Sequence, residues 1–312
     1  MGISMQRRIL TRILIYTGLL FCSLMRSPSA PAADVYAIET DYQQHKFSRI
    51  FIVGPIVVGD DEKFRKLILS LIKKDLPPYQ VSIFSNGGAA YPAMEIGRQI
   101  KMLMLPVEAP SRPINEPGKQ TCLVDPPPSA SSSMRVVWTY FYLEKRGDNR
   151  CRCDSACFLI WAGGGKRTGE GVYIHRPYFD AKMYGNLSFE QARQKYSEMQ
   201  GAVTAYLRET EVPETVIARM FSVDSADISN LTEAEYRQMA FRPYADELII
   251  ARCGPKVVRD RNQLRWAWEN ERSNTQAAQL MSRVRQWNGC EQSSWKAIFL
   301  EQVPEYLKMY DK

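Results

Sequence analysis

The stretch SRIFIVGPIVVGDDEKFRKLILSLIKKDLPPYQVSIFSNGG, residues 48–88, decides the fold class. Residues 48–58 are dense in Ile, Val and Phe, which is typical of a buried strand. Apolar residues then recur at helical spacing from Phe64 to Ile72, and two prolines stop that helix. Val81–Phe84 is a second short apolar run, and it ends in Ser-Asn-Gly-Gly. The stretch therefore predicts a strand, a helix and a second strand.

A further helix is expected directly after these glycines, because Pro92 suits a first turn and apolar residues recur on one side up to Leu103. Strands and helices alternating at these lengths predict parallel β-α-β units with right-handed crossovers. We therefore expect an α/β domain over residues 33–250, built of repeated β-α-β units around a parallel sheet. A Pro- and Ser-rich insertion is expected within it at about 106–150.

The second half of the chain continues the mixed pattern. Strands are expected at 135–144, 171–175 and 248–251, and helices at 187–210, 212–221 and 231–239. Residues 251–312 have a mostly helical pattern and include four tryptophans. We expect them to form a C-terminal helical appendage that is packed by aromatic side chains.

The first 32 residues predict an export signal. A basic segment at 1–12 precedes a short apolar run at 13–25, and Ala30 and Ala32 occupy the two positions that a signal peptidase reads. The apolar run is shorter than the roughly 20 residues of a spanning helix. An uncleaved N-terminal anchor is the alternative. We expect an exported, periplasmic protein that has no stable membrane span once residues 1–32 are removed.

The composition indicates a globular protein. Of the 312 residues, 45% are hydrophobic, 24% charged and 11% aromatic, which argues against a mostly disordered chain and against a polytopic membrane protein. The formal charge of +7 includes four arginines of the export signal, which has no acidic residue. Without them, 37 basic residues face 34 acidic ones, a balance of +3. Nucleic acid is therefore not an expected partner.

Six cysteines remain when Cys22 is removed with the signal, and an even number in an exported chain predicts disulfides. Proximity in the sequence suggests pairing Cys253 with Cys290, Cys122 with Cys151, and Cys153 with Cys157. The last two would lie about 6 Å apart on one helix turn, within bridging range. Zinc is the rival interpretation, but the cysteine spacing and the presence of only two histidines disfavour it. No metal and no cofactor are expected.

Three features could together carry chemistry. Gly87 and Gly88 follow a strand and precede a helix, so their backbone N–H groups can face a ligand oxygen. Ser155 lies at the expected start of an apolar helix, where unpaired amides and the helix dipole stabilise negative charge. His175 ends an expected strand. A serine, a histidine and two sources of oxyanion donors predict a nucleophilic site, although Ser155 by itself is more simply interpreted as a helix cap.

The order of these motifs resembles the Clp-protease/crotonase superfamily, and it is similar to the exported bacterial branch described as periplasmic ClpP-like proteins. The motifs are Ser85-Asn86-Gly87-Gly88 before a helix, Cys153-Asp154-Ser155-Ala156-Cys157, and a strand that ends in His175. The resemblance covers about residues 48–250 and not the C-terminal 60. It implies a ClpP/crotonase-like fold.

The resemblance also implies roles for individual residues. Ser155 would be the nucleophile and His175 the general base, with the amides of Gly88 and Ala156 as the oxyanion hole. The third member of the triad is expected as an Asp shortly before residues 231–235. Asp227 is nearest but offset by one position, and Asp224 is the second candidate.

Two classes of function remain open on the sequence. The first is a periplasmic serine hydrolase, a peptidase that acts through a Ser-His acyl-enzyme on a peptide or protein. The second is a non-catalytic binding or scaffold protein that keeps the ClpP-like fold, because fold alone does not assign a reaction. A coenzyme A enzyme is a distant third, because export removes it from the usual supply of substrate. A homo-oligomer is left open.

Overall fold

The computed structural model describes residues 32–42, 45–110, 152–179, 184–240, 242–258 and 261–311. The elements are β1 (Asp34–Tyr42), β2 (His45–Val53), α2 (Asp60–Lys73), β3 (Pro78–Phe84), α3 (Ala90–Met102), β4 (Val107–Glu108), β5 (Cys153–Asp154), α5 (Ala156–Ala162), β6 (Arg167–Thr168), β7 (Val172–Ile174), α7 (Phe189–Glu209), α8 (Glu214–Ser222), β8 (Ser229–Asn230), α9 (Glu233–Ala240), α10 (Pro243–Cys253), α11 (Arg261–Asn270) and α12 (Thr275–Tyr310). The expected export signal, except Ala32, and the expected strand at 135–144 lie outside the described residues.

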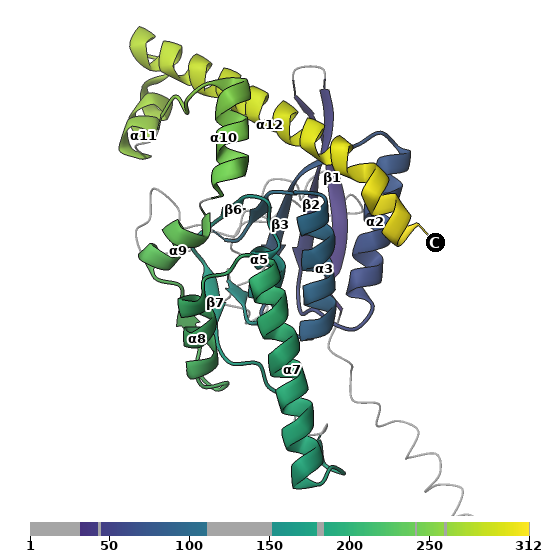
Figure 1. Ribbon diagram of the computed structural model, residues 1–312. Coiled ribbons are helices and arrows are strands. Elements are labelled where there is room, and N and C mark those ends of the chain that lie inside the picture. The colour runs from purple at the N-terminus through teal and green to yellow at the C-terminus, as the bar shows by residue number, and fades with distance from the viewer. Residues whose placement is uncertain are drawn as a thin grey trace, which may run out of the picture. The chain divides into compact units, whose positions relative to one another are not determined.

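A mainly parallel sheet holds the N-terminal half of the described chain together (Figure 1). Its order is β1-β2-β3-β4-β6, in which β2, β3, β4 and β6 run parallel and β1 pairs antiparallel with β2. In the β2–β3 pair, Ile50 lies opposite Val81 and Ile52 opposite Ile83. The parallel strands and the helices that connect them confirm the expected α/β class.

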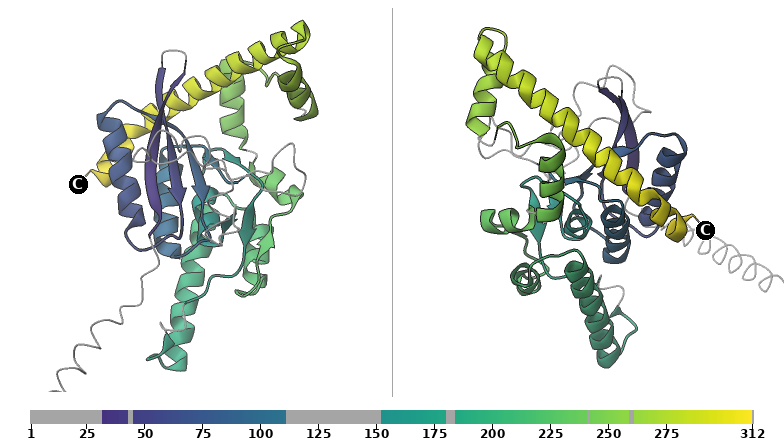
Figure 2. Two further views of the ribbon diagram at one scale, coloured as in Figure 1. Left: turned by 180° about the vertical axis from the view of Figure 1, so that it is seen from behind. Right: turned by 45° about the horizontal axis from the view of Figure 1, so that its top comes forward.

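Helices α2 and α3 lie beside this sheet (Figures 1 and 2) and bury their apolar sides against it. Phe64 and Ile68 of α2 are fully buried in the same cluster as Ile50 and Ile52 of β2. Their spacing of four residues places them on one side of the helix, as the sequence predicts. Burying such a side chain contributes about 1.5–3 kcal/mol, so this cluster is a main source of stability for the sheet.

A second, smaller sheet has the order β5-β7-β8, with β5 and β7 parallel and β8 antiparallel to β7. It is joined to the end of β3 by backbone hydrogen bonds, in which Ser85 N–H donates to the Arg152 carbonyl and Asp154 N–H donates to the Ser85 carbonyl. This junction brings residues 85–88 beside residues 152–156. The two motifs are thereby adjacent although some 65 residues separate them in the sequence.

The C-terminal helix α12 packs partly on the main core and partly in a smaller cluster with α10. Phe299 and Tyr306 of α12 belong to the main core cluster, and Tyr306 Oη donates a 2.8 Å hydrogen bond to Gln99 Oε1 of α3. Trp287 and Trp295 pack in a smaller cluster with α10, as expected for structural aromatics. The expected boundary at 250/251 falls inside α10. Figure 1 shows α12 running from the α11 end past α10 towards α2.

Three elements differ from the sequence-based expectation. Residues 248–251, expected as a strand, lie in α10, because Pro243 starts a helix in which only Ile249 of this run is buried. A short apolar run does not distinguish a strand from a helix. Val107 and Glu108 form β4, so the insertion expected from 106 begins after a core strand. The edge strand β1 was not predicted, since polar residues such as Glu39 and Asp41 obscure its alternation.

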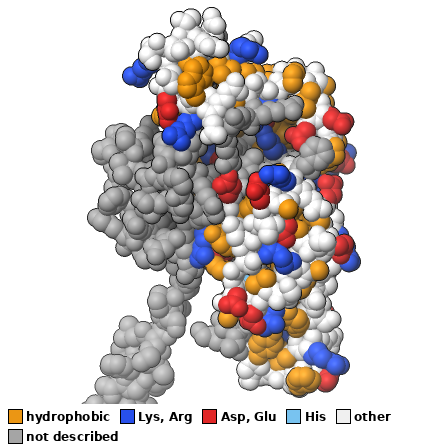
Figure 3. Space-filling view, turned by 90° about the vertical axis from the view of Figure 1, so that its left-hand side faces the viewer, with side chains coloured by type: hydrophobic (Ala, Val, Ile, Leu, Met, Phe, Trp, Pro, Cys, Tyr) orange, Lys and Arg blue, Asp and Glu red, His pale blue; other side chains and the backbone are white. Residues whose placement is uncertain are grey.

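Charges of both signs are mixed on one face of the described surface (Figure 3). On the face seen in Figure 3, Lys and Arg side chains are interspersed with Asp and Glu. None of the helices that the structure describes combines the length and the apolar character that crossing a membrane requires.

Candidate active site

Ser155 occupies a sharp turn between β5 and α5, and its backbone has φ 57° and ψ −116°. A residue other than glycine rarely adopts positive φ, and such conformations cluster at functional sites at a cost of about 1–3 kcal/mol. The turn is fixed on both sides, because Ser155 N–H donates to the Tyr173 carbonyl at 3.0 Å and Phe158 N–H donates to the Ser155 carbonyl at 2.9 Å. A serine on a strained strand-to-helix turn is the arrangement that exposes a nucleophile.

The geometry of Ser155 argues against a simple cap role. A capping serine has an extended backbone, and its side-chain oxygen accepts a hydrogen bond from an amide of the first turn. Ser155 makes no such side-chain bond to α5. Ser188, the N-cap of α7, shows the contrast, since its φ of −67° and ψ of 161° are extended and its Oγ accepts from Gln191 N–H.

Gly87 lies directly against Ser155. A Cβ atom added at Gly87 would be 2.7 Å from Ser155 Cβ and 2.8 Å from the Asp154 carbonyl oxygen, and Gly87 has a φ of 95°. Its amide donates to Ser85 Oγ at 3.1 Å, which holds the turn in place. Glycine at this position is therefore required by both contact and conformation.

The amides of Gly88 and Ala156 are both available to a ligand. Ile56 forms backbone hydrogen bonds to the residues on either side of Gly88. Its N–H donates to the Gly87 carbonyl, and its carbonyl accepts from Ala89 N–H, each at 2.8 Å. A trans peptide directs its C=O and N–H to opposite sides, so the Gly88 N–H points away from Ile56. Ala156 opens α5, where the first amides have no partner within the helix. Neither amide donates a hydrogen bond among the described residues.

His175 follows β7 and is buried, with 7% of its surface exposed. Its Nδ1 lies 2.8 Å from the carbonyl oxygen of Arg176. A carbonyl only accepts, so Nδ1 carries the proton and Nε2 of the neutral ring keeps its lone pair. The ring also lies against Tyr178, with 5.8 Å between the ring centroids. This contact therefore leaves Nε2 as the ring nitrogen that can accept a proton.

A cavity of about 560 Å³ brings these groups together, and Ser155, His175, Gly88 and Ala156 all line it. The rest of its wall is mainly apolar and comes from α3, α5, α7, α8 and the segment after His175, including Leu159, Phe179, Met199, Val203 and Met220. No Asp, Glu, Lys or Arg is among the described residues that line it. No hydrogen bond joins Ser155 to His175 in the described structure, although both face the same space.

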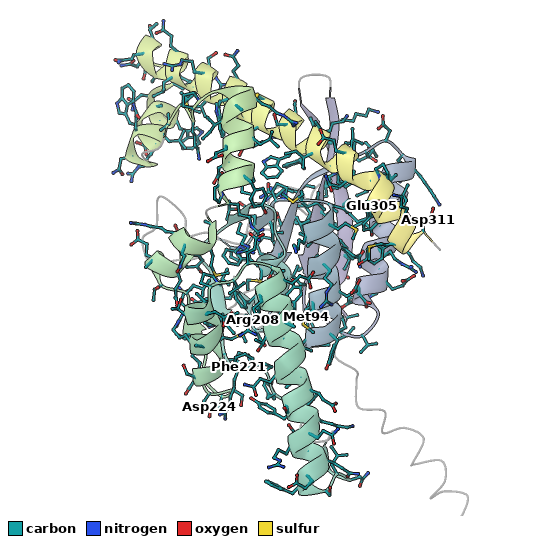
Figure 4. The ribbon with its side chains drawn as sticks, viewed as in Figure 1. Met94, Arg208, Phe221, Asp224, Glu305 and Asp311 are labelled. Carbon is teal, nitrogen blue, oxygen red and sulfur yellow. A yellow bond between two sulfur atoms is a disulfide. The ribbon has the colours of Figure 1, made fainter. Side chains whose placement is uncertain are left out.

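No described carboxylate bonds to His175. Asp227 is exposed, and its backbone N–H donates to the carbonyl of Asp224. Asp224 lies just beyond α8 (Figure 4), where its carboxylate pairs with Arg176 at 2.6 Å. The Ala226 amide and the Arg176 charge lower the pKa of Asp224. The role of either Asp in the triad stays a prediction, whereas the Arg176 carbonyl, which orients the ring, has no signature in the sequence.

Two of the three expected disulfides are confirmed. Cys153 and Cys157, both fully buried, are bonded on either side of Ser155 with 5.0 Å between their Cα atoms. Cys253 and Cys290 are bonded between α10 and α12, with 5.7 Å between their Cα atoms. The pair Cys122–Cys151 lies outside the described residues. Among the described residues, no cluster of three or more His, Cys, Asp or Glu side chains is arranged to hold a metal.

Comparison with known proteins gives only distant likenesses. No family model matches the chain, and no curated protein matches it. The solved structure of ClpP1 from Listeria monocytogenes is 14% identical, with a TM-score of 0.38 over 62% of this chain and 86% of that one. A mutant of the 1510-N membrane-bound stomatin-specific protease is 18% identical, with a TM-score of 0.34 over 66% of this chain and 84% of that one. Nothing about this chain's activity follows from likenesses this distant.

Proposed function

We propose that the chain is a serine hydrolase, a peptidase that acts through an acyl-enzyme on Ser155. The observation that carries this proposal is the positive-φ turn of Ser155 on the wall of a cavity that also holds His175 and two amides that donate to no described residue. A serine that only caps a helix needs neither the strained backbone nor the neighbouring base. Nucleophile, base and oxyanion donors around one cavity are the parts that acyl transfer needs.

In the proposed first step, Ser155 Oγ forms a bond to the carbonyl carbon of the substrate. His175 Nε2 takes the hydroxyl proton, and the carbonyl π electrons move to the oxygen. The resulting oxyanion lies between the N–H groups of Gly88 and Ala156. Removing one donor of such a pair typically costs about 2.7–4 kcal/mol of transition-state stabilisation.

The intermediate then collapses, and the carbon–nitrogen bond of the substrate breaks. The protonated His175 gives its proton from Nε2 to the leaving amine, which leaves an acyl ester on Ser155. Water attacks this ester, with His175 again taking a proton, and Ser155 Oγ leaves and is reprotonated. The apolar walls of the cavity favour the acyl portion of a peptide that carries apolar side chains.

The imidazolium formed in these steps has the Arg176 carbonyl as its partner at Nδ1. A carbonyl fixes the tautomer as a carboxylate does, but it carries a partial rather than a full negative charge. We therefore expect the carbonyl to stabilise the imidazolium less than the Asp of a complete Ser-His-Asp triad does. Asp227 or Asp224 would fill the role only if the segment after α8 moved towards His175.

We further propose that the protein is exported to the periplasm and belongs to the Clp-protease/crotonase superfamily. The support for export is the order of basic, apolar and small residues at 1–32, together with two disulfides. The support for the family is the motif order 85–88, 153–157 and 171–175, which lies around one cavity.

The second candidate function is a binding protein that keeps the same fold. It is favoured by one observation, the lack of a hydrogen bond between Ser155 and His175 in the described structure. Catalytic hydrogen bonds are often long before substrate is bound, so this geometry is compatible with both functions. A chemical probe of Ser155 distinguishes them.

The test is labelling by a fluorophosphonate, which a serine activated by histidine attacks and a passive serine does not. The wild-type protein should be labelled at Ser155, and Ser155→Ala should abolish labelling. His175→Ala should slow labelling by a factor of at least about 100, within the range of general-base catalysis. Ser188→Ala is the matched control, because it removes a true cap at a cost of about 1 kcal/mol and leaves the site intact. A folded protein that stays unlabelled at Ser155 would support the binding function instead.

A further inference from the structure

The backbone of Ala33 is held by a buried acidic side chain. Ala33 is 2% exposed and Asp60, the first residue of α2, is fully buried. The Ala33 N–H donates to Asp60 Oδ2 at 3.3 Å, and Lys63 Nζ lies 3.4 Å from the Ala33 carbonyl oxygen and 2.7 Å from Asp60 Oδ1. Both polar groups of Ala33 are therefore bound, while Ala32 before it is exposed.

We propose that Asp60 is the binding site for a free N-terminal ammonium group at Ala33, created when a signal peptidase hydrolyses the Ala32–Ala33 bond. This inference rests on the proposed export and not on the hydrolase activity. Hydrolysis breaks the C–N bond, and water adds its hydroxyl to the Ala32 carbonyl carbon. The amine of Ala33 keeps the remaining proton of that water and takes up one more from solvent. A neutral N–H···carboxylate bond thereby becomes an ammonium–carboxylate pair in a buried place.

The charges around Asp60 favour this pair. The first turn of α2 holds three acidic residues, Asp60, Asp61 and Glu62, whereas Lys63 places its ammonium on a side chain that is about half exposed. Lys63 pairs with Asp60 Oδ1, so a second cation can pair with Oδ2. The peptide N–H already donates to an ionised carboxylate. Cleavage makes the donor a cation as well, so the free N-terminus should bind more tightly through the added Coulomb attraction.

The same carboxylate oxygen is linked to the active site through the backbone. Asp60 Oδ2 also accepts from Val57 N–H at 2.8 Å. Val57 follows Ile56, whose N–H and C=O bond to Gly87 and Ala89 on either side of the oxyanion glycine. Release of the N-terminus should therefore order the segment that supports Gly88, so that the site is completed after export rather than before it.

The first experiment is the mass of the exported protein and its N-terminal peptide. A mature chain that begins at Ala33 is required, and a chain that begins elsewhere or keeps residues 1–32 overturns the proposal.

The second experiment is a mutant cycle on the purified protein. The two N-terminal forms begin at Ala33 or at a glycine added before Ala32, and each is made with the native Asp60 and with the substitution Asp60→Asn. The extension continues into solvent because Ala32 is exposed. We expect the extension to lower the folding equilibrium constant about tenfold in the native background and less than twofold in the Asp60→Asn background, where the carboxylate charge is gone. Equal losses in both backgrounds, or none in either, overturn the proposal.

Acetylation of Ala33 keeps the N–H donor and removes the charge, so it tests the pair without changing Asp60. Acetylated protein should match the extended form in stability, and the Ala89 amide should exchange with deuterium faster than in the protein with a free Ala33. Unchanged stability and unchanged exchange after acetylation would contradict an ammonium–carboxylate pair. None of these readouts depends on hydrolase activity.

Discussion

Substitution of Gly87 by alanine tests whether the turn around Ser155 is built as described. The new Cβ would lie 2.7 Å from Ser155 Cβ and 2.8 Å from the Asp154 carbonyl oxygen, distances at which something must shift. A φ of 95° adds a conformational cost of about 1–2 kcal/mol for a residue with a side chain. Part of this is offset, by about 0.4–1 kcal/mol, because alanine restricts the unfolded chain more than glycine does.

The chain offers matched controls for that conformational cost. Gly59 also has a φ of 95° and Gly254 a φ of 75°, and an added Cβ meets no atom within 4 Å at either position. Gly59→Ala should therefore lower the free energy of unfolding by about 1 kcal/mol. Gly254→Ala should lower it by about 1–3 kcal/mol, because its φ of 75° and ψ of 178° lie in a region that essentially only glycine adopts. Gly87→Ala should lower it by about 1–3 kcal/mol more than Gly59→Ala, the usual cost of overpacking.

The assay has two parts, urea unfolding and the rate of fluorophosphonate labelling. Displacing Ser155 by about 1 Å should slow labelling by about 100-fold, while the two controls should be labelled within about twofold of the wild-type rate. The reasoning is refuted if Gly87→Ala is as stable as Gly59→Ala and is labelled as fast as the wild type. A loss of stability without a loss of labelling would show that Ser155 does not depend on this contact.

Three further predictions concern the surroundings of the site. Replacing Cys153 and Cys157 by alanine should lower the free energy of unfolding by about 2 kcal/mol, because a short loop is opened, and should slow labelling. Removing the other described disulfide should cost about 4 kcal/mol, because its loop is longer, and should leave the labelling rate unchanged. Equal labelling rates in the two variants would contradict this. Burial raises the pKa of Glu235, but its bonds from Arg219 and Thr232 outweigh this and hold the pKa below the usual value. This carboxylate stabilises the fold above about pH 4.5 and the contribution is lost as pH falls through the lower folded pKa, so Glu235→Gln should flatten the acid side of the urea midpoint–pH curve. If the Arg176 carbonyl alone orients His175, Asp227→Ala should be labelled at the wild-type rate, whereas a loss greater than tenfold would show that Asp227 is the third member of the triad.

The sequence predicted the fold class well where the pattern was local. The apolar spacing in residues 64–72 led directly to α2, and the glycines after Val81–Phe84 marked the turn beside the site. Both predictions depend only on residues within a few positions of one another, so one sequence without an alignment is enough to make them. The strand predicted at residues 248–251 was wrong, because four apolar residues are too few to show whether their spacing is that of a strand or of a helix.

The candidate site was only partly predictable. Ser155 and His175 were selectable because serine at a helix start and histidine at a strand end are visible as residue types. The partner of His175 is a backbone carbonyl, and Ile56 supports Gly88 through backbone groups, so neither depends on a distinctive side chain. The cavity wall from Met199, Val203 and Met220 comes from helices far along the chain, which periodicity does not place.

The packing of α12 has a consequence for the time at which the protein can fold. Tyr306 bonds to Gln99, Tyr310 Oη donates to Glu95 Oε1 at 2.6 Å, and Arg65 donates to the Tyr310 carbonyl. Helices α2 and α3 therefore complete their packing only with side chains that are synthesised more than 200 residues later. Contacts of such long sequence separation slow folding, and these particular contacts form only when the last turns of α12 have left the ribosome. If the protein is exported as we propose, this late packing of α2 and α3 suits passage through a membrane channel in the unfolded state.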